Sequence, residues 1–223
     1  MVIEYKTRTQ VVVEAIREKI LKGEIKAGEP LRQAALADEL KVSRIPIREA
    51  LLQLEAEGLV EFEAHKGATA TKLSAEQVTE LFELRALLET ELLRLAIPKL
   101  TDAELDQTEL ILQQMNDAYQ QSATSGTWSE LNSRFHLSLY RAANRPLTFE
   151  MVQNLNSNSD RYIRVHLMLA GGVTKAGPEH VQLLDLCRQR KVEQACVVLK
   201  QHILGAAHEI NLLVQKLDAD AAQ

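Results

Sequence analysis

The chain has 223 residues, of which 46% are hydrophobic and only 4% aromatic, a length that accommodates one large or two small globular domains. Its 26 basic and 31 acidic side chains give a formal net charge of −5, which excludes a protein coated in positive charge but allows a small basic face. Residues 1–75 hold 12 basic and 12 acidic side chains, so the acidic excess lies entirely in the remaining residues.

The cysteine content and the N-terminal sequence both favour a cytoplasmic protein. Cys187 and Cys196 are too few for a disulfide framework and lack the spacing of a zinc pair, so we expect reduced packing residues. The first ten residues are charged and polar, unlike a signal peptide. No apolar run approaches the roughly 20 residues needed to span a bilayer, so we expect no membrane association.

Three helices are predicted in the first 60 residues. Apolar residues recur with a helical period over 7–21, and "KGEIKAGEPL" then ends this helix at Gly23 and turns at Gly28. "RQAALADEL" is a short second helix, and the three residues "KVS" connect it to a third helix that ends at Gly58. Two helices joined so tightly must cross steeply, as in a helix-turn-helix.

The third helix has an apolar stripe and a polar edge. Ser43 is a candidate N-cap, and Pro46 is tolerated in the first turn because N–H groups there have no intrahelical partner. Arg44 and Arg48 are four residues apart at the edge of the stripe. The stripe itself comprises Ile47, Ala50, Leu51 and Leu54.

A β-hairpin follows this helix. Apolar and polar residues alternate in "VEFEAH", and "KG" is a turn before the returning "ATATKL". Three helices and a hairpin together predict a winged helix-turn-helix over residues 1–73.

The N-terminal end of the third helix is suited to contact DNA. In a helix-turn-helix this end enters the major groove, where an arginine such as Arg44 or Arg48 can donate two hydrogen bonds to guanine. Ile45 can meet a thymine methyl group, and Ser43 with the helix N-terminus can hold a phosphate. The alternative is that both arginines are solvated and pair with acidic side chains of the same helix, Glu49 or Glu55.

Residues 74–223 are helical in pattern almost throughout. Six segments end at proline, glycine or polar breaks, and the first two begin with the candidate caps Ser74 and Thr101. We therefore expect a mainly α protein in which the winged domain precedes an all-α antiparallel bundle.

Four residues of this bundle form a candidate metal site. Asn132 and His136 are four apart on one helix, whereas His180 and His202 belong to two further helices. Directed inward, they would offer one oxygen and three imidazole nitrogens, a set suited to a divalent ion such as zinc or nickel. The alternative is that these histidines are ordinary core or surface residues.

The segment "LADELKVSRIPIREALLQLEAEGLV" resembles the signature of the GntR superfamily of bacterial transcription regulators, and with "KAGEPL" and "HKGATATKL" the resemblance covers about residues 8–73. It implies that Arg44 and Arg48 read bases and that the wing residues His65, Lys66 and Gly67 approach the DNA. Two positions depart from the family: Ile45 replaces the usual threonine, and Ala34 lies where some members carry arginine.

The second part is similar to the FCD domain, the helical effector domain of the FadR subgroup, and its six helices favour the VanR-type branch. The resemblance rests on "LRALLETELLRLAI", "NSRFHLSLYRAANRP" and "EHVQLLDLCRQRKVEQACVVLKQHI". It implies a divalent metal on Asn132, His136, His180 and His202. Asparagine in place of the commoner aspartate removes one negative charge, which either weakens the metal or leaves a more positive site for an anion.

The family also implies a switchable dimer. Its effectors are mostly small carboxylates, for which the candidate ligands here are Arg85, Arg134, Arg161 and Tyr162. A two-fold dimer places two recognition helices on successive major-groove faces, so the operator should be an inverted repeat of double-stranded DNA.

Two other function classes remain open from the residues alone. A metal-dependent hydrolase could use the three histidines and a bound water, but common catalytic motifs are missing and Glu179, beside His180, is expected to point elsewhere. A bundle that only dimerises, with no ligand, is the third reading.

Overall fold

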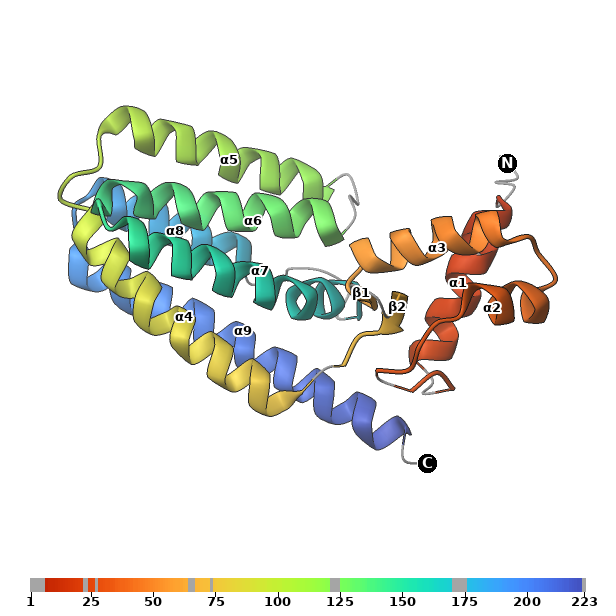
Figure 1. Ribbon diagram of the computed structural model, residues 1–223. Coiled ribbons are helices and arrows are strands. Elements are labelled where there is room, and N and C mark those ends of the chain that lie inside the picture. The colour runs from red at the N-terminus through yellow and green to blue at the C-terminus, as the bar shows by residue number, and fades with distance from the viewer. Residues whose placement is uncertain are drawn as a thin grey trace. The chain divides into compact units, whose positions relative to one another are not determined.

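The structure, a computed structural model, describes residues 7–21, 24–26, 28–63, 67–72, 74–120, 125–169 and 176–221. The chain divides into two compact units, one of Met1–Ser74 with Leu213–Gln223 and the other of Ala75–Leu212 (Figure 1). Each unit has its own buried apolar core.

Three helices form most of the first unit, as predicted: α1 (Arg8–Leu21), α2 (Gln33–Leu40) and α3 (Arg44–Ala56). Lys41 adopts a left-handed conformation with φ of 54°, which ends α2 and allows the three-residue connection to α3. The predicted stripe of α3 is fully buried together with apolar residues of α1. The main buried side chains are Val12, Val13, Ile16, Ile47, Ala50, Leu51 and Leu54.

The hairpin is also confirmed. Strands β1 (Val60–Glu63) and β2 (Gly67–Ala70) are antiparallel, with Val60 opposite Ala70. A feature that the sequence did not predict lies on the other edge of β2, where Pro30 forms a bridge with Thr69 and the Leu31 amide donates to the Ala68 carbonyl over 2.8 Å. The turn after α1 thus supports the base of the wing.

The six predicted helices follow the hairpin in the described residues, and all belong to the second unit except the end of the last one, which continues past Leu212 into the segment grouped with the first unit. A single turn of 3-10 helix, Arg141–Ala143, separates the third from the fourth. The helices are α4 (Ala75–Ala96), α5 (Asp102–Gln120), α6 (Ser125–Tyr140), α7 (Pro146–Leu169), α8 (Ala176–Arg188) and α9 (Val192–Ala221).

These helices pack side by side, α5 against α6 and α8, and α7 against α4 and α6 (Figure 1).

The cap expected at Thr101 is present as a reciprocal pair: the Glu104 amide donates to the Thr101 hydroxyl, and the Thr101 amide donates to the Glu104 carboxylate. In the described part of the chain no helix is both long enough and apolar enough to cross a membrane.

Candidate functional sites

The N-terminal end of α3 presents a polar face. Ser43, Arg44 and Arg48 are all exposed, and Ile45 is 70% exposed. Ser43 occupies the N-cap position with extended backbone, but its side chain makes no capping hydrogen bond, so this expected bond is absent. Its hydroxyl and the first amides of the helix therefore stay accessible to an anion such as a phosphate.

Neither Arg44 nor Arg48 is held by a carboxylate in the described residues. Glu49, the nearest acidic candidate in sequence, instead accepts a hydrogen bond from the Thr9 hydroxyl at 2.8 Å. The pairing of Arg44 and Arg48 with Glu49 or Glu55, which the sequence left open, is not found among the described side chains. Both guanidinium groups thus keep all their donors for another molecule.

The wing residues are only partly described. Gly67 begins β2 with φ of +82°, a conformation that favours glycine, and a Cβ there would meet no neighbouring atom. This position is open to an approaching backbone. His65 and Lys66 lie outside the described residues.

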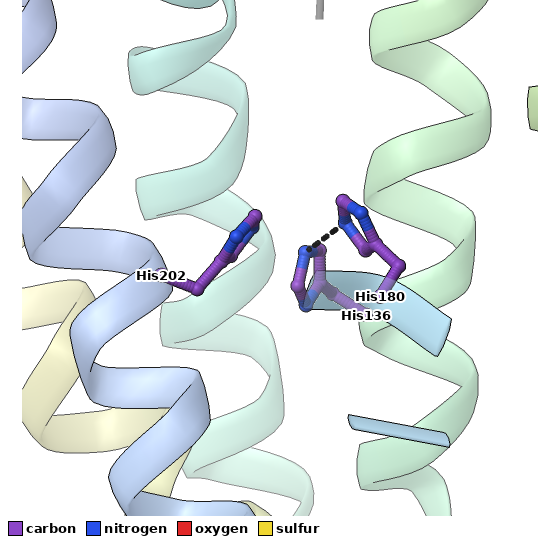
Figure 2. A group of neighbouring side chains, drawn as sticks. All are labelled: His136, His180 and His202. Atoms are coloured by element: carbon purple, nitrogen blue, oxygen red, sulfur yellow. Dashed lines mark hydrogen bonds between the residues drawn. The ribbon is translucent and has the colours of Figure 1, made fainter. Parts of the chain in front are cut away.

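Three histidines from three helices converge in the second unit. Figure 2 shows the rings of His136 (α6), His180 (α8) and His202 (α9) turned toward one another. One ligand nitrogen from each lies within 4.8 Å of the others, and the two Nε2 atoms of His136 and His180 are 3.2 Å apart. Asn132 joins this group, because its Oδ1 is 2.9 Å from Nε2 of His180.

These distances fit a shared metal ion. Ligand atoms placed tetrahedrally at about 2.0–2.1 Å from zinc are about 3.3 Å apart. The separations of 2.9 and 3.2 Å from Nε2 of His180 to Asn132 and to His136 are close to that value. The three histidine nitrogens together lie within 4.8 Å of one another, so an ion shared by all of them requires these side chains to move closer together. Three nitrogens and one oxygen are also a donor set that first-row divalent metals accept.

The electrostatic setting keeps His136 neutral. Burial lowers the pKa of His136 well below its ordinary value, and electrostatic interactions with the neighbouring His180, His202 and Arg85 lower it further. A neutral imidazole is the form that binds a metal.

Glu179 supports His202, contrary to the expectation that it points elsewhere. Its Oε2 lies 2.6 Å from Nδ1 of His202. A carboxylate behind a ligating imidazole fixes the ring orientation and leaves Nε2 for the metal. Glu179 and His202 come from adjacent helices, so their contact depends on how α8 and α9 pack rather than on sequence spacing.

A buried polar chain leads from His136 to α4 and α7. The Tyr140 hydroxyl lies 3.4 Å from Nδ1 of His136 and donates to Oε2 of Glu89 over 2.8 Å. Nε of Arg85 donates to Oε1 of Glu89 at 2.7 Å, and Nη1 of Arg85 donates to Ser159 at 3.1 Å. Burial raises the pKa of the Tyr140 hydroxyl well above its ordinary value, with the Glu89 charge adding to the shift, so the phenol stays a donor.

The four predicted effector residues occupy different surroundings. Arg85 is buried and belongs to the hydrogen-bonded chain that leads from His136. Tyr162 is buried and donates from its hydroxyl to Gln77 at 3.1 Å, while the Arg161 guanidinium stacks 4.9 Å from the Tyr162 ring. Arg134 is exposed. It is two residues before His136 on α6, so its side chain points away from that of His136. This placement gives no support to Arg134, whose role stays a prediction.

Sequence reasoning missed Glu89 and Tyr140. Each has a local signal, because Glu89 is four residues after Arg85 and Tyr140 is four after His136, so each shares a helix face with a singled-out residue. Their contact across 51 residues of sequence has no such signal.

Comparisons with known proteins match both units. Residues 8–69 match the family "Bacterial regulatory proteins, gntR family", and residues 80–205 match the FCD domain. The chain is similar to the Nta operon transcriptional regulator of Aminobacter aminovorans, with 31% identity over 79% of this chain and 81% of that protein. It is also similar to the transcriptional repressor RspR of Escherichia coli K12, with 23% identity over 93% of this chain and 90% of that protein.

Among solved structures, a GntR family transcriptional regulator from Pseudomonas syringae pv. tomato DC3000 is similar, with a TM-score of 0.57 and 33% identity. The match covers 93% of this chain and 88% of the solved chain.

Proposed function

The chain belongs to the GntR family of bacterial regulatory proteins and carries an FCD domain; on this premise we propose that it is a metal-dependent, effector-switched regulator. It is a transcriptional regulator rather than an enzyme, as the families and relatives are. In the proposal, residues 1–73 bind DNA and residues 74–223 bind a divalent metal and a small carboxylate. DNA binding places the protein in the cytoplasm.

The DNA-binding part of the proposal rests on the free end of α3. Arg44 and Arg48 read base edges in the major groove, Ile45 contacts a thymine methyl group, and Ser43 holds a phosphate. The wing residues His65, Lys66 and Gly67 contact the minor groove or backbone. Unpaired arginines beside exposed Ile45 support this assignment, because a solvated face would not need a large apolar residue there.

The proposed protein is a homodimer that reads an inverted repeat. Helices α4 and α7, which pack together, each leave two large apolar side chains exposed, Leu84 and Leu87 on α4 and Leu147 and Met151 on α7. Exposed apolar groups of this kind favour burial against a second copy, and a two-fold axis pairs equal surfaces. The two recognition helices then meet successive major grooves.

The convergence of Asn132, His136, His180 and His202 is the observation that carries the metal proposal. Zinc or nickel suits three imidazoles and one amide oxygen. Because three neutral imidazoles and one amide bring no negative charge to the ion, the bound metal keeps its positive charge and attracts an anionic effector.

The carboxylate of the effector is proposed to bind the metal and Arg85. The hydrogen bonds of Arg85 use Nε and Nη1, so Nη2 is the nitrogen that remains for an anion. Arg161 and Tyr162, on the same helix as Ser159, are further candidates. An effector that prefers one placement of the DNA-binding units over another changes operator affinity by that preference.

Metal content tests the proposal. Protein purified without added metal should contain about one equivalent of zinc or nickel per chain by mass spectrometry, and the double variant H136A/H180A should contain none. The exposed histidine variant H208A is the matched control and should keep its metal. Stoichiometric metal in the double variant would refute this ligand set, and metal-free wild-type protein that still responds to a carboxylate would refute the metal's role.

A further inference from the structure

A buried asparagine on α7 has no hydrogen-bond partner in the described part of the chain. Asn156 is only 6% exposed, and both its Nδ2 and its Oδ1 are buried without a partner. It belongs to the inward stripe of α7, which consists of Val152, Asn156, Ser159, Tyr162 and Val165. An unsatisfied buried amide is destabilising, so its presence in a core stripe calls for a partner.

Helix packing places Asn156 at the level of the histidine cluster. Helices α6 and α7 are antiparallel neighbours, and the Ser129 hydroxyl of α6 donates to Asp160 of α7. Four residues before Asp160 is Asn156, and four after Ser129 is residue 133, between the metal-ligand candidates Asn132 and His136.

The buried polar chain gives the same location independently. Ser159, three residues after Asn156 and on the same face of α7, accepts the hydrogen bond from Arg85. Arg85 connects through Glu89 and Tyr140 to His136. Asn156 is therefore one helical turn from Ser159, the hydrogen-bond partner of the arginine that we assign to the effector carboxylate.

The chemistry of an amide restricts the missing partner. Nδ2 needs a hydrogen-bond acceptor and Oδ1 needs a donor. A carboxylate accepts only, so it leaves Oδ1 unsatisfied, whereas a hydroxyl or amino group can donate to Oδ1 and a neighbouring oxygen can accept from Nδ2. We propose that Asn156 binds a hydroxyl or amino group of the effector, which is then a hydroxy- or amino-carboxylate rather than a plain carboxylic acid. This inference rests on the proposed function and narrows its ligand class.

Matched acids test the inference on the full-length, metal-loaded protein. Lactate and alanine are each compared with propionate, and malate and aspartate with succinate, by isothermal titration calorimetry. Wild-type protein should bind at least one hydroxy or amino acid about tenfold or more tightly than the parent acid, the unsubstituted propionate or succinate with which it is compared. The reason is that the parent acid leaves Asn156 unpaired. In N156L, of similar size but without polar atoms, the difference should shrink below about twofold, while affinity for the parent acid is retained.

Two additional readouts separate a ligand contact from a structural role. Without ligand, N156L should keep its metal and be at least as stable as the wild type, because an apolar side chain replaces an unpaired amide. If N156L fails to fold, N156A, which removes both the donor and the acceptor with a smaller side chain, should likewise lose the discrimination.

The possible failures are distinguishable. Discrimination that persists in both variants, or equal binding of the paired acids by wild type, would overturn the role of Asn156 and leave the carboxylate proposal standing. Destabilisation of N156L without any change in discrimination would assign Asn156 to an internal water only. If no acid of the panel binds the metal-loaded protein, both the inference and the proposed effector class are overturned.

Discussion

Removal of the Arg85 charge should strongly destabilise the helical unit. Arg85 is 4% exposed and Glu89 0%, and their ion pair of 2.7 Å is shielded from water. In R85M, the Glu89 carboxylate keeps only the Tyr140 hydroxyl as a partner among the described contacts. Leaving one charge of a buried pair uncompensated costs about 3–5 kcal/mol, so R85M should lower the unfolding free energy by that amount.

An exposed arginine on the same helix is the matched control. Arg94 also contacts two carboxylates, Glu91 and Glu193, but its side chain is 43% exposed. Since water screens such pairs, R94M should cost under about 1 kcal/mol. The double variant R85M/E89L should recover much of the loss, because it removes both charges of the buried pair.

Urea unfolding of metal-free protein gives the measurement. Trp128, the one tryptophan of the chain, is nearly buried in this unit beside His180, so its fluorescence follows the unit itself. A loss in R85M no larger than in R94M would refute the reasoning that the Arg85–Glu89 pair is buried and interdependent.

The remaining predictions concern the other parts of the chain. R48A should weaken binding to an operator selected from random duplexes by about 1–3 kcal/mol in fluorescence anisotropy at fixed salt, whereas R145A in the helical unit should not; equal effects would exclude Arg48 as a base reader. E179A should weaken zinc binding about tenfold in a competition titration, and E193A should leave it unchanged; an unaffected E179A would remove Glu179 from the support of the metal. Burial raises the pKa of Cys187 to about 12, so its thiol should resist a disulfide reagent at pH 8 until urea unfolds the protein, and rapid native labelling would contradict its burial.

Much of the first unit could be predicted because its signals are local. The stripe from Ile47 to Leu54 has a helical period, and the connection to α2 is three residues long, so helix, turn and helix follow from sequence spacing. The strand-like pairing of Pro30 with Thr69 could not be predicted, because it joins segments whose own sequences indicate only a turn and a wing. The Ser43 cap was wrong in detail, since residue type indicates the cap position but not the side-chain rotamer.

In the second unit, sequence reasoning reached the metal-ligand candidates but not their surroundings. The four-residue spacing of Asn132 and His136 predicts a shared face, whereas the convergence with His180 and His202 was an inference from family resemblance. The Arg85–Glu89–Tyr140 chain and the Glu179 contact depend on helix packing over long sequence separations, which periodicity does not encode. Asn156 had no signal at all, because its importance lies in a missing partner.

The most direct test of the central claim measures operator affinity against carboxylate concentration in metal-loaded protein. A carboxylate that binds wild type should change the operator Kd by about tenfold or more, a coupling of about 1.4 kcal/mol, and should have no effect on H136A/H180A. A carboxylate that binds wild-type protein tightly but leaves its operator Kd unchanged would contradict the proposal that metal, effector and DNA are coupled.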